Sequence, residues 1–131
     1  MLSTRHFSLL LFAFFVLTFT TSCGDDEDDC MAPELSANIV GSWNATTGAA
    51  TFQADGTLID PDDAIIGAEI NGVVYTRKSY SVNQDTLTVV AMPPTGSGMI
   101  SSDFVAIQNE CNRIVLDIGL GAALTETLNR Q

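Results

Sequence analysis

The stretch TFQADGTLI, residues 51–59, decides the fold. Two short segments of alternating apolar and polar residues flank an Asp-Gly pair, which is the strongest short-range signal for a β-hairpin. The same signal recurs at Asn71-Gly72, between the predicted strands Ile65–Ile70 and Val73–Val82. Asp60–Asp63, which lies between the two hairpins, is predicted as a turn because its proline cannot donate to a strand ladder. The chain is therefore expected to fold through antiparallel hairpins.

The segments on either side of these hairpins are also predicted as short strands. Thr86–Met92 is the clearest, because Leu87, Val89 and Ala91 alternate with polar or smaller residues. The other predicted strands are Ile39–Thr46, Met99–Ile107, Arg113–Ile118 with Ile114, Leu116 and Ile118 facing inward, and Ala123–Arg130; Pro93–Gly98 is predicted as a loop and Gln108–Asn112 as a polar turn. About eight strands joined by tight turns, with no long crossover, favour an all-β, up-and-down antiparallel barrel. A two-sheet β-sandwich is the alternative architecture.

The N-terminal region has the pattern of an export signal. Arg5 precedes an apolar run, Phe7–Phe19, which ends in small and hydroxylated residues before Cys23. A charged start, an apolar run of about 7–15 residues and a small-residue cleavage site form a secretory signal. The run is too short to span a bilayer as a helix, which needs about 20 apolar residues.

This N-terminal region resembles the signal of bacterial lipoproteins, which is cleaved before a cysteine that then carries lipid. The matching residues are Thr20-Thr21-Ser22-Cys23, although Thr20 stands where the family usually has leucine. The resemblance implies a diacylglycerol on the Cys23 thiol and a further acyl chain, such as palmitate, on its amino group. Two or more chains give stable membrane anchoring. A plain signal peptide with a chance cysteine is the alternative.

The lipoprotein resemblance also divides the chain and suggests its location. Residues 1–22 would be the signal peptide, 23–36 the acylated cysteine with a flexible acidic tether, and 37–131 the β-domain. The acidic string Asp25–Asp29 is similar to the tag that directs some lipoproteins of Gram-negative bacteria to the cell surface. A solvated spacer would have the same composition. We therefore expect a lipid anchor in the outer membrane, with either the periplasmic or the outer face as its location.

Two further cysteines remain once Cys23 is assigned to the lipid. Cys30 lies where the tether meets the domain, and Cys111 lies in the predicted polar turn. Outside the inner membrane the compartment is oxidising, so the pair is expected to form a disulfide. Closing a loop of about eighty residues would stabilise the fold by roughly 4–4.5 kcal/mol in the chain-entropy model. Two separate free thiols are the alternative.

Charge and composition exclude several classes of function. From Cys23 onward the chain has sixteen acidic residues against four basic ones, a formal charge of −12, which disfavours nucleic acid as a partner. The only histidine, His6, belongs to the signal, so Ser-His and Cys-His catalysis would lack a base. Lys78 and Ser79 are neighbours on one predicted strand and point to opposite faces. We expect neither an enzyme nor a bound cofactor.

A metal site is also not expected. Two cysteines and no histidine do not make a zinc site. Asp60, Asp62 and Asp63 begin like a calcium loop, but such a loop would need Gly at position 65 and Glu at position 71, where this chain has Ile65 and Asn71.

A second resemblance concerns the β-domain itself. Val40-Gly41-Ser42-Trp43 resembles the Gly-x-Trp signature on the first strand of lipocalins, and Thr127–Arg130 resembles the last strand of lipocalin-like domains in small bacterial lipoproteins. The resemblance implies that Arg130 lies across Trp43 and plugs the closed end of the barrel. Such a cation–π contact contributes about 0.5–2 kcal/mol.

The lipocalin resemblance further implies a small apolar ligand in the barrel mouth. The side chains expected to line it are Tyr75, Tyr80, Phe104 and Met99, with the loop Pro93–Ser102 at the rim. At about a hundred residues the domain is small, and interiors of small eight-stranded barrels are often filled by side chains. A non-enzymatic structural or protein-interaction module with a filled barrel is therefore the alternative function. Its protein partner cannot be identified from the sequence.

One candidate modification site lies outside the predicted barrel mouth. Asp85-Thr86-Leu87 matches a short motif at which some bacteria O-glycosylate exported proteins, which makes Thr86 the candidate acceptor. A hairpin turn followed by the first residue of a strand explains the same three residues without a sugar.

Overall fold

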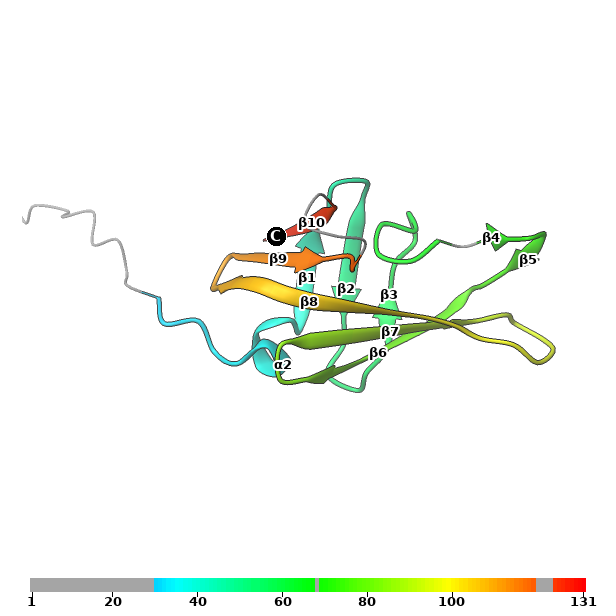
Figure 1. Cartoon of the computed structure of the whole chain (residues 1–131), viewed down its shortest axis with the longest axis horizontal. Coiled ribbons are helices and arrows are strands. Elements are labelled where there is room, and N and C mark those ends of the chain that lie inside the picture. The colour runs from blue at the N-terminus through cyan, green and yellow to red at the C-terminus, as the bar shows by residue number, and fades with distance from the viewer. Residues whose placement is uncertain (1–29, 68, 120–123) are drawn as a thin grey trace, which may run out of the picture.

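The computed structural model describes residues 30–67, 69–119 and 124–131 of the chain. One helical turn, α2 (Leu35–Asn38), precedes the strands. The strands are β1 (Gly41–Asn44), β2 (Ala49–Phe52), β3 (Leu58–Ile59), β4 (Glu69–Ile70), β5 (Val73–Val74), β6 (Arg77–Asn83), β7 (Thr86–Met92), β8 (Ile100–Glu110), β9 (Arg113–Asp117) and β10 (Thr125–Arg130) (Figure 1). Within the described ranges, no helix is long and apolar enough to cross a membrane.

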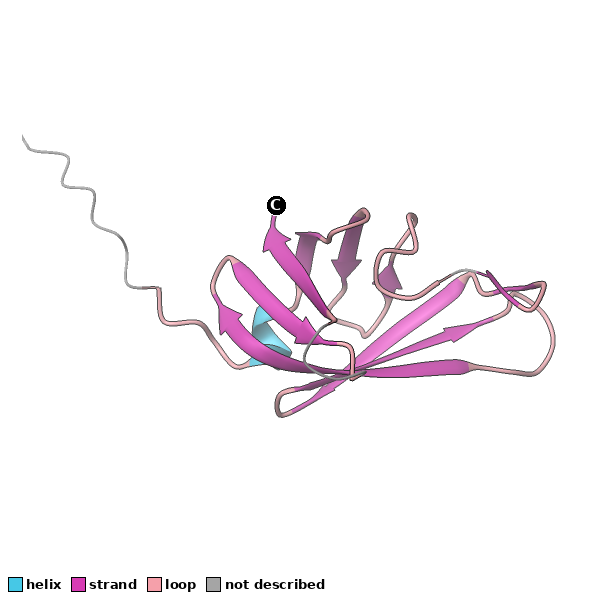
Figure 2. Cartoon of the chain, turned by 45° about the horizontal axis from the view of Figure 1, so that its top comes forward, coloured by secondary structure: helices cyan, strands magenta, loops and turns pink. Residues whose placement is uncertain are grey.

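Eight of these strands form one antiparallel sheet that curls into a nearly closed barrel (Figure 2). The strand order is β3-β2-β1-β10-β9-β8-β7-β6, so that each strand lies beside its neighbour in sequence and β10 pairs with β1. The two edge strands meet through one bridge, Thr57 to Ser79, and through the Tyr80 N–H, which donates to the Gly56 carbonyl at 2.8 Å. The up-and-down barrel predicted from the sequence is confirmed, and the sandwich alternative is wrong.

The barrel interior is packed with the apolar residues that the strand alternation predicted. Leu87, Val89 and Ala91 on β7 are fully buried, as are Ile114 and Leu116 on β9. The other large, fully buried side chains are Trp43, Phe52, Ile39 and Leu128. Burying a side chain of this size stabilises the fold by about 1.5–3 kcal/mol, so this core is the main source of stability.

Both predicted hairpins form. Between β2 and β3, Ala54–Gly56 is a three-residue loop in which the Thr57 N–H donates to the Asp55 carboxylate at 2.9 Å. This bond lowers the pKa of the Asp55 carboxyl group below its usual value. Between β4 and β5, Asn71 and Gly72 have φ of 52° and 78°. Positive φ at both central residues defines the type I′ turn, which explains the choice of these two residues.

The segment Ile65–Ile70 differs from its prediction as a barrel strand. Only Glu69 and Ile70 are in a strand, and they pair with Val74 and Val73 in a separate two-stranded ribbon outside the main sheet. Ile65 and Ile66 lie in a loop and are nevertheless buried, at 9% and 7% exposure. The apolar run is therefore explained by loop residues whose side chains enter the core. The sequence pattern of such a loop is the same as that of a short buried strand.

Two further boundaries differ from the sequence-based expectation. β8 continues to Glu110 through a bulge between Ala106 and Gln108, so the predicted polar turn at 108–112 shrinks to Cys111 and Asn112. At the other end, α2 occupies residues just before β1, and its Leu35 is 2% exposed within the core. The folded domain therefore reaches into the range 23–36 that was assigned to the tether.

Trp43 and Arg130 face each other where the first and last strands of the barrel pair. They are register partners in the β1–β10 ladder, and the Arg130 guanidinium carbon lies 4.3 Å from the Trp43 ring centroid. The indole N–H donates to the Ile39 carbonyl at 2.7 Å. Gly41 has φ +132°, and a Cβ there would approach Arg130 Nη1 to 3.1 Å. The glycine of the Gly-x-Trp motif is thus required by its backbone conformation, and a side chain there would also press on the arginine.

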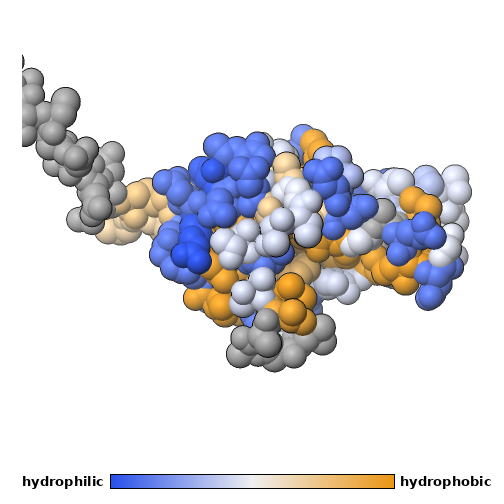
Figure 3. Space-filling view, turned by 90° about the horizontal axis from the view of Figure 1, so that it is seen from above, coloured by the Kyte–Doolittle hydropathy of each residue, from blue (hydrophilic) through white to orange (hydrophobic). Residues whose placement is uncertain are grey.

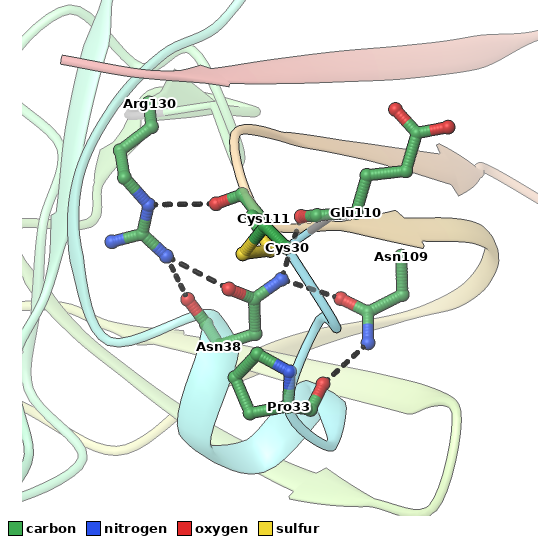
Figure 4. Close-up of a disulfide and its surroundings, with 7 residues drawn as sticks. All are labelled: Cys30, Pro33, Asn38, Asn109, Glu110, Cys111 and Arg130. Carbon is green, nitrogen blue, oxygen red and sulfur yellow. Dashed lines mark hydrogen bonds between the residues drawn. A yellow bond between two sulfur atoms is a disulfide. The ribbon is translucent and has the colours of Figure 1, made fainter. Parts of the chain in front are cut away.

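The predicted disulfide between Cys30 and Cys111 is confirmed, and it lies beside this stack (Figure 4). The Arg130 Nε–H donates to the Cys111 carbonyl at 2.9 Å, and Nη2 donates to the Asn38 carbonyl and side-chain oxygen at 2.7 and 2.8 Å. The buried Asn38 amide in turn donates to Asn109 and to the Glu110 carbonyl. We call this end of the barrel the closed end: it holds α2, the disulfide, Trp43 and Arg130.

Replacing Arg130 with lysine is expected to lower the free energy of unfolding by about 2–3 kcal/mol, because a lysine ammonium cannot stack flat on Trp43 and reach three acceptors together. Urea denaturation of the Arg130→Lys variant measures the effect. Arg113→Lys is the matched control, since Arg113 is exposed at the start of β9 and should change stability by no more than about 0.5 kcal/mol. Equal losses in the two variants would contradict this role for Arg130.

Candidate ligand-binding site in the barrel mouth

A cavity of about 480 Å³ opens at the end of the barrel opposite the closed end. β8 runs from Ile100, in the cavity wall, to Glu110 beside Asn38, and β9 runs back from Arg113 to Asp117, just before Ile118 in the wall. The apolar lining residues are Ile65, Ile66, Ile70, Ile100, Phe104, Leu116 and Ile118. Ligand pockets usually have volumes of about 300–1,000 Å³ and mostly apolar walls, so the size and lining suit a small apolar molecule. We call this cavity the mouth cavity.

Of the four side chains predicted to line the mouth, Phe104 does so. Tyr80 packs edge-on against Phe52 with ring centroids 5.0 Å apart, and its hydroxyl donates to the Gln53 carbonyl at 2.6 Å. Burial raises the pKa of the Tyr80 hydroxyl, and the negative charge of Asp55 adds to the effect. Tyr80 is therefore part of the β3–β6 seam and does not line the cavity.

Tyr75 and Met99 also lie outside the cavity lining. Tyr75 is half-buried against the core, just before β6, whereas Met99 is 67% exposed at the start of β8. The Pro93–Gly98 segment is a loop, as predicted, and of the range Pro93–Ser102 the cavity uses only Ile100, Ser101 and Ser102. The wall of the mouth cavity is accordingly built from the first residues of β8 and from the loop containing Ile65 and Ile66.

A buried ion cluster, which the sequence did not reveal, holds that loop in place. The Asp60 carboxylate accepts hydrogen bonds from the N–H groups of Ala64, Ile65 and Ile66 at 2.7, 3.2 and 3.2 Å. Its other partner is the Lys78 ammonium at 3.0 Å, from the inner face of β6. Asp60 and Lys78 are 6% and 8% exposed. The carboxylate thus converts residues 64–66 into a fixed wall of the mouth cavity.

The Lys78 ammonium lies among the aspartates of the Asp60–Asp63 turn. It donates to the Asp60 carbonyl at 2.9 Å and to the Asp63 carboxylate at 2.6 Å, besides its bond to the Asp60 side chain. These three bonds use all three protons of the ammonium group. In the part of the chain that the structure describes, no group of three or more His, Cys, Asp or Glu side chains could hold a metal ion.

The cavity contains few polar groups, and one of them is a carboxylate. Ser101, Ser102 and Glu126 are its polar lining residues. Glu126 lies on β10 at the same strand parity as buried Leu128 and as Arg130, and its Oε1 accepts a hydrogen bond from the Thr46 N–H at 2.6 Å. Glu126 was not predicted as a site residue from the sequence, although its alternation with Leu128 and Arg130 was a usable signal.

Apolar side chains also gather on the outer surface near the mouth. Ile70, Val73 and Val74 of the β4–β5 ribbon are 41–47% exposed. Figure 1 places this ribbon at the end of the molecule away from α2, and Figure 3 shows apolar surface at that end. We call these three residues and Met99 the apolar rim.

The candidate glycosylation residue lies far from the mouth. Thr86 begins β7, directly after the β6–β7 turn, and is partly exposed on the outer face of the barrel. In that turn Gln84 has φ 54°, and the Asp85 carbonyl accepts the Ala106 N–H at 2.7 Å. The cysteine predicted to carry lipid, Cys23, lies outside the described residues.

Comparison of the chain with protein-family models, with curated proteins and with solved structures finds no match.

Replacing Lys78 with methionine is expected to lower the free energy of unfolding by about 3 kcal/mol, because it leaves the buried Asp60 carboxylate without its cation. The double variant Lys78→Met/Asp60→Asn should recover part of this loss, since no unpaired buried charge remains. Urea denaturation of Lys78→Met, Asp60→Asn and the double variant tests this. If Asp60→Asn lowers the free energy of unfolding by the same amount in the Lys78→Met background as in the unsubstituted chain, the two groups do not interact.

Proposed function

We propose that the chain is a lipid-anchored lipoprotein of the bacterial outer membrane whose lipocalin-like barrel binds a small apolar ligand. The observation that carries the proposal is the mouth cavity of about 480 Å³ with its mainly isoleucine, leucine and phenylalanine walls. Burial of apolar ligand surface against such walls contributes about 25 cal/mol per Å² before the costs of association. The Gly-x-Trp motif and its stacked arginine support the resemblance to lipocalins.

The wall of the mouth favours binding over catalysis. Its lining holds one carboxylate, two serines and otherwise apolar or small residues. The Glu126 carboxylate accepts the Thr46 N–H, and among the described residues no hydrogen bond joins it to Ser101 or Ser102, as an activated serine would need. The buried Lys78 is engaged with Asp60 and Asp63. These observations support a non-enzymatic function.

The disulfide sets the orientation of the barrel in this proposal. Cys30 is seven positions after Cys23, a span of at most about 25 Å. Because Cys30 is bonded to Cys111 at the closed end, the closed end lies near the membrane and the mouth faces away from it. Ligand would then exchange with the aqueous phase or with another protein.

A structural or protein-interaction module is the second candidate, and the apolar rim favours it. Ile70, Val73, Val74 and Met99 are exposed around the mouth, and exposed apolar patches often mark sites of protein association. This candidate predicts no uptake of small molecules.

Ser102→Phe is expected to abolish uptake of a neutral apolar fluorescent probe by the secreted domain, residues 30–131, because a phenyl ring at this lining position fills the mouth cavity. Probe fluorescence titrated against protein measures the affinity. Ser81→Phe is the matched control, since Ser81 is exposed on the outer face of β6 and should leave uptake unchanged. If the unsubstituted domain takes up no probe, the interaction module replaces the binding proposal.

Cys23→Ala is expected to abolish incorporation of a labelled fatty acid and to release the protein from the outer membrane fraction. Metabolic labelling followed by membrane fractionation measures both effects. Cys30→Ala is the matched control: it removes the disulfide but should retain the label. Labelling of Cys23→Ala at the original level would overturn the assignment of the lipid.

A further inference from the structure

We propose that the mouth cavity selects an apolar amine, in which a hydrocarbon body occupies the apolar walls and an ammonium group bonds to Glu126. This inference rests on the proposed function and names the ligand class of the same site. Charge is distributed unequally around the cavity, because its lining contains a carboxylate and no basic side chain.

Glu126 is the one lining residue with a charged side chain. Its backbone is fixed by pairing with Leu116 in the β9–β10 ladder, and Leu116 also lines the cavity. One carboxylate oxygen accepts the Thr46 N–H at 2.6 Å, which orients the group. A carboxylate has about four lone-pair sites on its two oxygens, so acceptor capacity remains for a donor inside the cavity.

The cations of the described residues are all engaged or placed elsewhere. Arg77 donates to the Pro93 carbonyl, Lys78 to Asp60 and Asp63, and Arg130 to Asn38 and Cys111. Arg113 begins β9, next to the turn at Cys111, which belongs to the closed end. Among the residues that the structure describes, Glu126 therefore has no salt-bridge partner.

An anionic ligand such as a fatty acid would place its carboxylate near Glu126 without a cation to compensate. The repulsion is reinforced by the domain as a whole, because residues 30–131 contain eleven acidic and four basic side chains. An ammonium group instead gains a charge-assisted hydrogen bond in a partly desolvated site. Ser102, which shares the inner face of β8 with Phe104, adds a hydroxyl acceptor to the lining. Charge complementarity thus selects the amine.

The test compares three ligands that share one hydrocarbon body. The full acylated chain, held in phosphatidylcholine nanodiscs, is titrated calorimetrically with octylamine, octanol and octanoate, and the heats of empty nanodiscs are subtracted. We expect octylamine to bind about tenfold or more tightly than octanol, which corresponds to one charge-assisted hydrogen bond, and octanoate to bind more weakly than octanol. Octanoate binding as tightly as octylamine would overturn the amine assignment.

The variant Glu126→Gln isolates the contribution of the carboxylate. Glutamine retains an oxygen for the Thr46 N–H, so the fold is preserved, while the advantage of octylamine over octanol should disappear. Asp103→Asn removes the same charge from the outer face of β8, where Asp103 bonds to Thr88, and should keep the advantage. Equal behaviour of the two variants would contradict a specific role for Glu126.

The outcomes separate this inference from the proposed function. Binding of all three ligands with equal affinity overturns the amine assignment and leaves the apolar binding function intact. Binding of none of them overturns both.

Discussion

The pairing of Trp43 with Arg130 is the constraint on which the barrel depends. It lies in the β1–β10 ladder, which joins the first strand to the last and so turns a meander into a ring. The other seam, between β3 and β6, has a single bridge and the packing of Tyr80 against Phe52. A barrel with one such sparse seam needs a firm opposite joint. The stack, the hydrogen bonds of Arg130 and the adjacent disulfide provide that joint.

The closed end and the mouth differ because they are stabilised by different interactions. At the closed end, α2 and the fully buried Trp43 and Leu128 fill the interior, and Asn38 satisfies the neighbouring polar groups. Toward the mouth the interior wall includes the loop containing Ile65 and Ile66. Hydrogen bonds to Asp60, which is paired with Lys78, hold this loop in place. A buried ion pair contributes little net stability but specifies one arrangement when it is fully hydrogen-bonded. Here it fixes the shape of the mouth cavity.

The turns and strand faces that depend on neighbouring residues were predicted from the sequence. The contacts between segments far apart in the chain were missed. Asn71-Gly72 predicted its turn because positive φ at both residues is a property of those residues, and the period of two in Thr86–Met92 predicted the buried face of β7. The run Ile65–Ile70 was assigned wrongly, since Ile65 and Ile66 are buried in a loop whose N–H groups bond to Asp60, and Asp60 in turn pairs with Lys78 on another strand. Trp43 and Arg130 were paired only through the lipocalin resemblance, and Tyr80 was misplaced because strand parity gives the inward face without the height along the barrel axis.

The separation of the two ends explains how a domain of about a hundred residues can hold both a core and a cavity. In a small domain every buried side chain matters for stability, and an interior cavity removes contacts from the core. Of the largest fully buried side chains, Trp43, Phe52 and Leu87 lie away from the mouth cavity, whereas Leu116 lines it. The cavity walls use half-buried residues such as Ile100 and Ile118 together with the Ile65–Ile66 loop. Variation of Ser102 or Glu126 can therefore change the ligand without weakening the joint that closes the barrel.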